Sequence, residues 1–143
     1  MLKKEISYTD FNGNERIEAH YFNLTQTELN EINIETGGTL VESLQRMVEN
    51  RDAIGLAKFF RNLIVYSYGK KSDDGVFFDK GEDHAVGKRF TMTAAYDKLF
   101  IELLSDPTGE KPREFLYGIV PEDVAAKAKA EAPLIKVGDE ENN

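Results

Sequence analysis

The stretch from Ala53 to Ser67, AIGLAKFFRNLIVYS, constrains the fold of this chain more than any other segment. At about 100° per residue, its apolar side chains sweep through roughly 180° of a helix surface. Ile54 and Val65 widen this apolar arc further. A helix of this kind either lies at the centre of a core or forms half of an interface, and the sequence favours the core.

Two alternating stretches before this segment predict a β-hairpin. Residues 4–9 and 15–22 each alternate apolar and polar side chains, and Asn12-Gly13 between them favours a tight turn. The alternation predicts two sets of apolar side chains on the strand faces: Ile6 with Tyr8, and Ile17 with Ala19 and Tyr21. A lone hairpin needs helices packed on its apolar face.

Helix starts and stops can be placed by their end signals. Thr25 with Glu28, and Thr39 with Glu42, are two capping boxes that predict a short helix near 26–33 and another from about residue 40. Further helices are expected at 53–67, at 91–105, after a start near Pro112 and after Pro121. Met92 opens the apolar stripe of the 91–105 helix, and Gly118 is expected to stop the short helix that follows.

These patterns predict an α+β fold that is mainly α. A hairpin over 1–24 packs on a bundle of about five to six helices within 25–132. We expect a single globular domain over 1–132 and a disordered acidic tail over 133–143.

Composition excludes several classes of protein. The chain has no cysteine, which removes disulfides, thiolate metal sites and cysteine nucleophiles. Its net charge of −8 repels phosphate backbones, so nucleic acid is not expected as a partner. No apolar run is long enough to span a membrane and the N-terminus lacks a signal-peptide core, so we expect a cytoplasmic protein without a membrane partner.

An acidic segment over 73–84 is the strongest candidate for chemistry. It contains six potential metal ligands: Asp73, Asp74, Asp79, Glu82, Asp83 and His84. A calcium loop that began at Asp73 would need ligands where Gly75 and Phe77 stand, so the register fails. We therefore expect no metal and no cofactor. We interpret Gly69 as the left-handed end of the long helix, Ser72 to Gly75 as a turn and 76–80 as a short strand.

Catalytic signatures are missing elsewhere in the chain. It has no Gly-x-Ser-x-Gly elbow and no phosphate-binding glycine motif. Aromatic side chains are the other resource, because a tyrosine ring is apolar while its hydroxyl is hydrated. Contact with a partner protein is predicted for four residues near the end of the long helix: Phe59, Leu63, Tyr66 and Tyr68.

The order of small motifs resembles the tail assembly chaperone family of long-tailed phages and prophages of Gram-positive bacteria. The similar motifs are Tyr21-Phe22-Asn23-Leu24-Thr25 with Glu28-Leu29, Tyr68-Gly69 through Lys71-Ser72 to Asp74-Gly75, and Ile119-Val120-Pro121. The resemblance spans roughly residues 3–124 and implies a non-enzymatic protein. Such chaperones bind the tape measure protein, help recruit the major tail protein, tend to self-associate and are absent from the finished virion.

Two other functions stay open at the level of sequence. One is a small metal-dependent hydrolase that uses the acidic 73–84 segment, and the other is a regulatory protein-binding module of a bacterial host.

Overall fold

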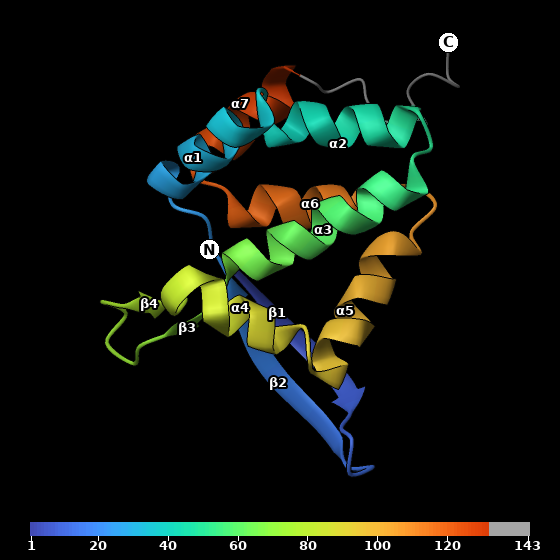
Figure 1. Cartoon of the computed structure of the whole chain (residues 1–143). Coiled ribbons are helices and arrows are strands. Elements are labelled where there is room, and N and C mark those ends of the chain that lie inside the picture. The colour runs from blue at the N-terminus through green and yellow to red at the C-terminus, as the bar shows by residue number, and fades with distance from the viewer. Residues whose placement is uncertain (132–143) are drawn as a thin grey trace.

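The hairpin is the first half of a four-stranded antiparallel sheet. The computed structural model describes residues 1–131, apart from the side chains of Ile34 and Glu131. In it, β1 (Leu2–Thr9) pairs with β2 (Glu15–Phe22), β2 pairs with β3 (Tyr68–Lys71), and β3 pairs with β4 (Phe78–Asp79) (Figure 1). The hairpin prediction is confirmed, and two short strands from the middle of the chain extend it.

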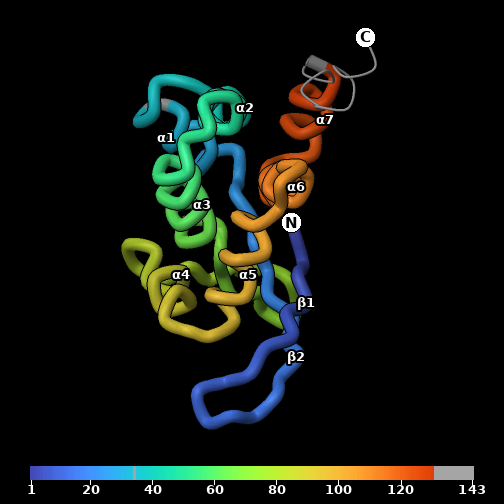
Figure 2. Tube along the Cα trace, turned by 90° about the vertical axis from the view of Figure 1, so that its right-hand side faces the viewer, coloured from blue at the N-terminus to red at the C-terminus, as the bar shows by residue number. Residues whose placement is uncertain are grey.

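Helices make up most of the remaining described structure. They are α1 (Gln26–Thr36), α2 (Leu40–Glu49), α3 (Ala53–Ser67), α4 (Ala85–Phe90), α5 (Ala94–Leu104), α6 (Glu110–Ile119) and α7 (Glu122–Glu131), with a 3₁₀ turn, η1 (Glu82–His84), before α4. Helices α1, α2 and α7 lie at one end of the molecule, and the hairpin turn projects at the other (Figures 1 and 2). The predicted α+β, mainly α class is confirmed.

Both capping boxes form as the sequence predicts. Thr25 accepts a hydrogen bond from the backbone N–H of Glu28, whose carboxylate accepts one from Thr25 in return, and Thr39 and Glu42 do the same. Helix α1 is longer than expected, because it continues to a left-handed Gly37 (φ 76°).

The centre of the core is the segment that the sequence singles out. Phe60 and Ile64 on α3 are completely buried. Phe115 of α6 lies edge-on to Phe60 at 6.3 Å and to Phe22 of β2 at 5.3 Å between ring centroids. These rings join the sheet to the helices. Truncation of such a ring to alanine costs about 3–5 kcal/mol of unfolding free energy.

The predicted apolar face of β2 is wrong. Ile17 is 71% exposed, whereas Phe22 on the opposite face is completely buried. In the observed register, Ile6 faces Glu18 and Leu2 faces Phe22. Because residues that are opposite each other share a face of the sheet, Glu18 and Phe22 point toward the helices with Ile6.

The end of α3 also differs from the prediction. Gly69 is not left-handed, because α3 runs directly into β3 through an extended Tyr68 (φ −71°, ψ 136°). Gly69 instead provides space, since a Cβ there would lie 2.7 Å from the ring of Phe78. The turn that follows is confirmed: the Gly75 N–H donates to the Ser72 carbonyl at 3.0 Å, and Gly75 has φ 76°.

Three other helix boundaries need correction. Residues 85–90, where the sequence analysis places no helix, form α4, and a Cβ at Gly87 would lie 2.0 Å from the Val65 carbonyl oxygen. Helix α5 begins after Thr93, so Met92 precedes it and is 72% exposed. Gly118 lies inside α6 and does not end it.

Two expectations lie beyond this description. The acidic tail predicted over 133–143 is outside the described residues, and the single domain over 1–132 stays a prediction. Within residues 1–131, no helix combines the length and the apolar character that crossing a bilayer requires.

A half-buried ion pair ties the segment after β4 to α1. Lys80 Nζ donates to the Asn23 carbonyl at 2.7 Å and to Glu28 Oε2 at 2.8 Å. Burial lowers the pKa of Lys80. Burial alone would raise the pKa of Glu28, but the hydrogen bonds from Lys80 and Thr25 outweigh it and hold that pKa below its usual value. Glu28 therefore caps α1 and anchors Lys80 at once.

We expect Glu28→Gln to lower the unfolding free energy by about 1–3 kcal/mol, because it leaves the Lys80 ammonium half-buried without a carboxylate. Glu42→Gln is the matched control, since Glu42 occupies the same capping position in α2, is exposed and forms an ion pair with no lysine among residues 1–131. Urea unfolding at neutral pH measures both variants. An equal loss in the two would contradict a special role for the Lys80 pair.

Candidate functional site

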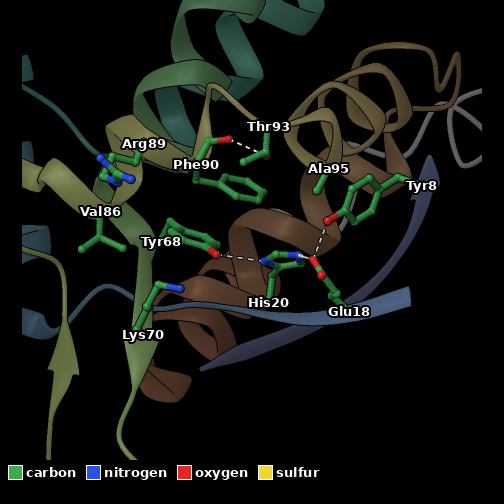
Figure 3. A pocket seen from close by; sticks show the side chains of 10 residues that line it. All are labelled: Tyr8, Glu18, His20, Tyr68, Lys70, Val86, Arg89, Phe90, Thr93 and Ala95. Atoms are coloured by element: carbon green, nitrogen blue, oxygen red, sulfur yellow. Dashed lines mark hydrogen bonds and ion pairs between the residues drawn. The ribbon is translucent and has the colours of Figure 1, made fainter. Parts of the chain in front are cut away.

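A cleft of about 310 Å³ lies between the hairpin, β3 and the α4–α5 segment (Figure 3). Its polar wall comes from the face of β2 that the sequence assigned to solvent. Ten side chains from β1, β2, β3, α4 and α5, with Thr93 just before α5, line it: Tyr8, Glu18, His20, Tyr68, Lys70, Val86, Arg89, Phe90, Thr93 and Ala95.

A chain of polar contacts crosses this cleft from β1 to β3 (Figure 3). Tyr8 Oη donates to Glu18 Oε1 at 2.6 Å, His20 Nε2 lies 3.5 Å from the same oxygen, and His20 Nδ1 lies 2.9 Å from Tyr68 Oη. The hydrogen bond from Tyr8 holds the pKa of Glu18 below its usual value. Glu18 is therefore a carboxylate at neutral pH.

The tautomer of His20 follows from its neighbours. The Glu18 carboxylate can only accept a hydrogen bond and lies 3.5 Å from Nε2, which favours the tautomer of neutral His20 with its proton on Nε2. Nδ1 then accepts a hydrogen bond from Tyr68 Oη, and burial raises the pKa of Tyr68 to about 12, so the phenol keeps its proton. Burial lowers the pKa of His20, and this outweighs the opposite effect of Glu18. In the folded protein the ring is therefore neutral near pH 7.

Aromatic stacking closes the inner wall of the cleft. The Tyr68 and Phe90 rings stack with centroids 4.0 Å apart and planes at 9°, and His20 lies 5.1 Å from Phe90. The only hydroxyl on the α5 side, that of Thr93, donates to the Phe90 carbonyl at 2.7 Å. The side chains that line the cleft therefore hold β1, β2, β3 and α4 together through polar and aromatic contacts.

The structure separates the four predicted contact residues into two pairs. Leu63 is 3% exposed and Tyr68 is 7% exposed, so both belong to the core in this conformation. Phe59 and Tyr66 are partly exposed and lie two helical turns apart on α3, which places them on one face. Tyr66 stacks on His84 at 4.3 Å.

Tyr66 also lines a small acidic cleft between α1 and α3. The cleft has a volume of about 120 Å³ and includes Ile32, Glu31 and Glu35 from α1. Glu31 and Glu35 are exposed, and neither has an ion-pair partner among the described residues. An apolar surface with free carboxylates beside it is a suitable site for a segment that carries apolar and basic side chains.

The acidic 73–84 segment forms turns rather than a ligand cluster. Asp74 accepts hydrogen bonds from the Ser72 hydroxyl and from the Val76 N–H, and Asp79 accepts one from the Gly81 N–H. Within residues 1–131, no group of three or more His, Asp or Glu side chains is placed to hold a metal ion.

Sequence reasoning missed the Glu18–His20 side of the cleft. The alternation Ile17, Ala19, Tyr21 is the more apolar of the two faces of β2, and it led to the wrong choice. Phe22 could have indicated the buried face, because it lies on the same face of the strand as Glu18 and His20. It also stands at the end of β2, where the chain leaves the hairpin.

A third, larger groove runs between α1, α2 and α7. It has a volume of about 600 Å³, and its lining mixes polar side chains with the apolar Leu29, Val41 and Val124. Apolar side chains are also exposed at both hairpin turns, where Phe11 is 81% exposed and Phe77 is 70% exposed. Together, the fold and these surfaces define a small α+β protein suited to contact with other proteins.

Comparison with known families identifies the class more closely. A family model described as phage tail assembly chaperone matches residues 1–143, and the chain belongs to this family. Neither a curated protein nor a solved structure matches it. Family membership indicates tail proteins as partners in general.

The buried His20 makes stability depend on pH. Its pKa is lower in the folded state than in the unfolded chain, so the unfolded chain binds more protons below about pH 6.5. We expect the unfolding free energy to fall as the pH decreases from about 7 to about 5. In this window Glu18 and Glu28, whose pKa values are lowered, stay ionised in the folded protein.

His20→Asn should flatten this pH dependence, because the amide can accept the hydrogen bond from Tyr68 without titrating. Chemical unfolding of the wild type and the variant at several pH values measures the slope. An unchanged slope in the variant would show that His20 does not cause it.

Proposed function

We propose that this protein is a non-enzymatic chaperone that binds the tape measure protein and helps recruit the major tail protein during tail-tube assembly. It acts in the cytoplasm of the infected host cell, which we take to be a Gram-positive bacterium, and it is absent from the finished virion. The family match over the whole chain carries this proposal.

The face of α3 that bears Phe59 and Tyr66 is the proposed contact surface for the client. Both side chains are partly exposed, and Phe59 is supported from beneath by Phe60, whose ring lies edge-on at 5.2 Å. A client helix that lays its apolar side on this face would bury the two rings. Basic side chains on that helix would lie near Glu31 and Glu35 of α1.

Leu63 and Tyr68 support this surface from within. Leu63 is buried on the same side of α3 as Phe59, one turn further along, and Tyr68 anchors the end of the helix through its stack with Phe90. Direct contact of either residue with a client would require α3 or β3 to move.

Strong binding to a long client does not require a strong single contact. When chaperone copies that are joined to one another bind along one client, each further contact is effectively intramolecular, and the overall affinity exceeds that of one site. We therefore propose that the protein also self-associates.

Phe59→Ala and Tyr66→Ala should each weaken binding to the tape measure protein by roughly tenfold, because partly exposed aromatic rings are typical hot spots. The loss of unfolding free energy should stay below about 2 kcal/mol, since neither ring is fully buried. Titration calorimetry with the co-expressed client, combined with circular dichroism melting, measures both effects.

Leu63→Ala on the same helix is the control for the core. It should lower the unfolding free energy by about 2–5 kcal/mol and leave the affinity of the folded fraction unchanged. Val124→Ser tests the groove between α1, α2 and α7 as the alternative surface. Loss of binding in Val124→Ser, with unchanged binding in Phe59→Ala and Tyr66→Ala, would show that the client contacts this groove rather than the face of α3.

A further inference from the structure

Strand β1 forms a long edge of the sheet. The strand order is β1-β2-β3-β4, so β1 and β4 are the two edge strands. Strand β4 contains two residues, whereas β1 contains eight. Within residues 1–131, no strand pairs with the outer side of β1. A long edge strand presents a row of backbone donors and acceptors to which another strand can be added.

The hairpin turn shows which residues of β1 direct their backbone groups outward. The Asp10 N–H donates to the Asn14 carbonyl at 2.8 Å, and bonded and non-bonded pairs alternate along an antiparallel ladder from that point. Every second residue of β1 therefore bonds to β2, and the others face away. The outward residues are Lys3, Glu5, Ser7 and Thr9, whose side chains are all exposed.

The hydrogen bonds between β2 and β3 agree with this alternation. The Asn23 N–H donates to the Ser67 carbonyl at 2.8 Å, and Tyr21 pairs with Gly69. Odd-numbered residues of β2 thus bond to β3 and even-numbered ones bond to β1. The alternation from the turn is unbroken along the whole hairpin.

The charged side chains Lys3 and Glu5 of β1 can face opposite charges on a second copy of the strand. Antiparallel pairing with a second β1, about a two-fold axis through Lys4, places Lys3 opposite Glu5 of the partner subunit and Leu2 opposite Ile6 of the partner subunit. Neither Lys3 nor Glu5 has an ion-pair partner among the described residues. This register also places Lys4 opposite Lys4 of the partner subunit; within one chain, Glu102 lies 2.7 Å from the Lys4 ammonium and offsets its charge.

The same charges disfavour neighbouring registers. Moving the axis to Glu5 places that residue opposite Glu5 of the partner subunit, and moving it to Lys3 places two lysines opposite each other. Like charges directly across a strand pair are destabilising.

The geometry points to β1 as a dimerisation edge, where it pairs antiparallel with β1 of a second copy in the register centred on Lys4. The two four-stranded sheets then form one continuous sheet. This inference rests on the proposed self-association and names its surface, which is separate from the α3 face proposed for the client.

A charge-exchange experiment on the full chain tests the inference. Lys3→Glu and Glu5→Lys each place like charges across the paired strands, so each should raise the dimer dissociation constant by about tenfold or more. An equimolar mixture of the two variants restores opposite charges across the strands and should associate as well as the wild type. Sedimentation equilibrium at low salt measures all three, and circular dichroism confirms the fold.

Lys71→Glu is the matched control, because it makes the same change of charge on an exposed residue of β3, away from the edge. It should dimerise like the wild type. A wild type that stays monomeric, or association that neither Lys3→Glu nor Glu5→Lys weakens, would overturn the inference. A monomeric wild type whose binding to a tail protein is lost in both edge variants would also overturn it, since the occupant of the edge would then be the client.

Client binding separates this inference from the proposed function. Dimerisation with the predicted charge dependence, but no binding to the tape measure protein, would reject the proposed function and support the edge. Monomeric edge variants that still bind the client at single sites would support both.

Discussion

Burial of the Phe22 ring determines which face of the sheet packs against the helices, and most of the molecule depends on this choice. The ring lies 5.4 Å from Tyr68, 5.9 Å from Phe90 and 5.3 Å from Phe115 between centroids, so it joins β2 to β3, α4 and α6. Because strand side chains alternate with a period of two, placing Phe22 inward also places His20 and Glu18 inward. The core therefore receives polar groups that it must satisfy.

The polar cleft is the consequence of that requirement. A buried polar group is costly unless it is hydrogen-bonded. The Tyr8–Glu18 and Tyr68–His20 hydrogen bonds meet part of this requirement across the strands, whereas His20 Nε2 lies 3.5 Å from Glu18 and makes no hydrogen bond. This network and the aromatic stack on Phe90 position β3 and α4, and β3 in turn fixes the end of α3. The α3 face proposed for the client is therefore held in place by residues that do not contact it.

A chaperone that binds its client through one surface and its own copies through another can coat a long chain. The partly exposed rings of α3 lie on a helix, and the open backbone groups of β1 lie at the edge of the sheet. The two surfaces bind through different interactions. Apolar burial on α3 favours an amphipathic client helix, whereas backbone hydrogen bonding at β1 favours a strand. Binding at one surface therefore leaves the other available.

Local alternation, turn chemistry and helix period are enough to predict the hairpin, both capping boxes, the extent of α3 and its place in the core. The order of small motifs also carried the resemblance that the family match confirmed. Which face of β2 is inside depends on tertiary packing, because burial of one ring outweighed the more apolar pattern of Ile17, Ala19 and Tyr21. Tertiary packing also decided that Gly69 and Gly87 provide space for neighbours, and that Leu63 and Tyr68 are internal while Phe59 and Tyr66 are accessible. Such outcomes depend on which elements meet across the core, and a periodic pattern along the chain does not contain that information.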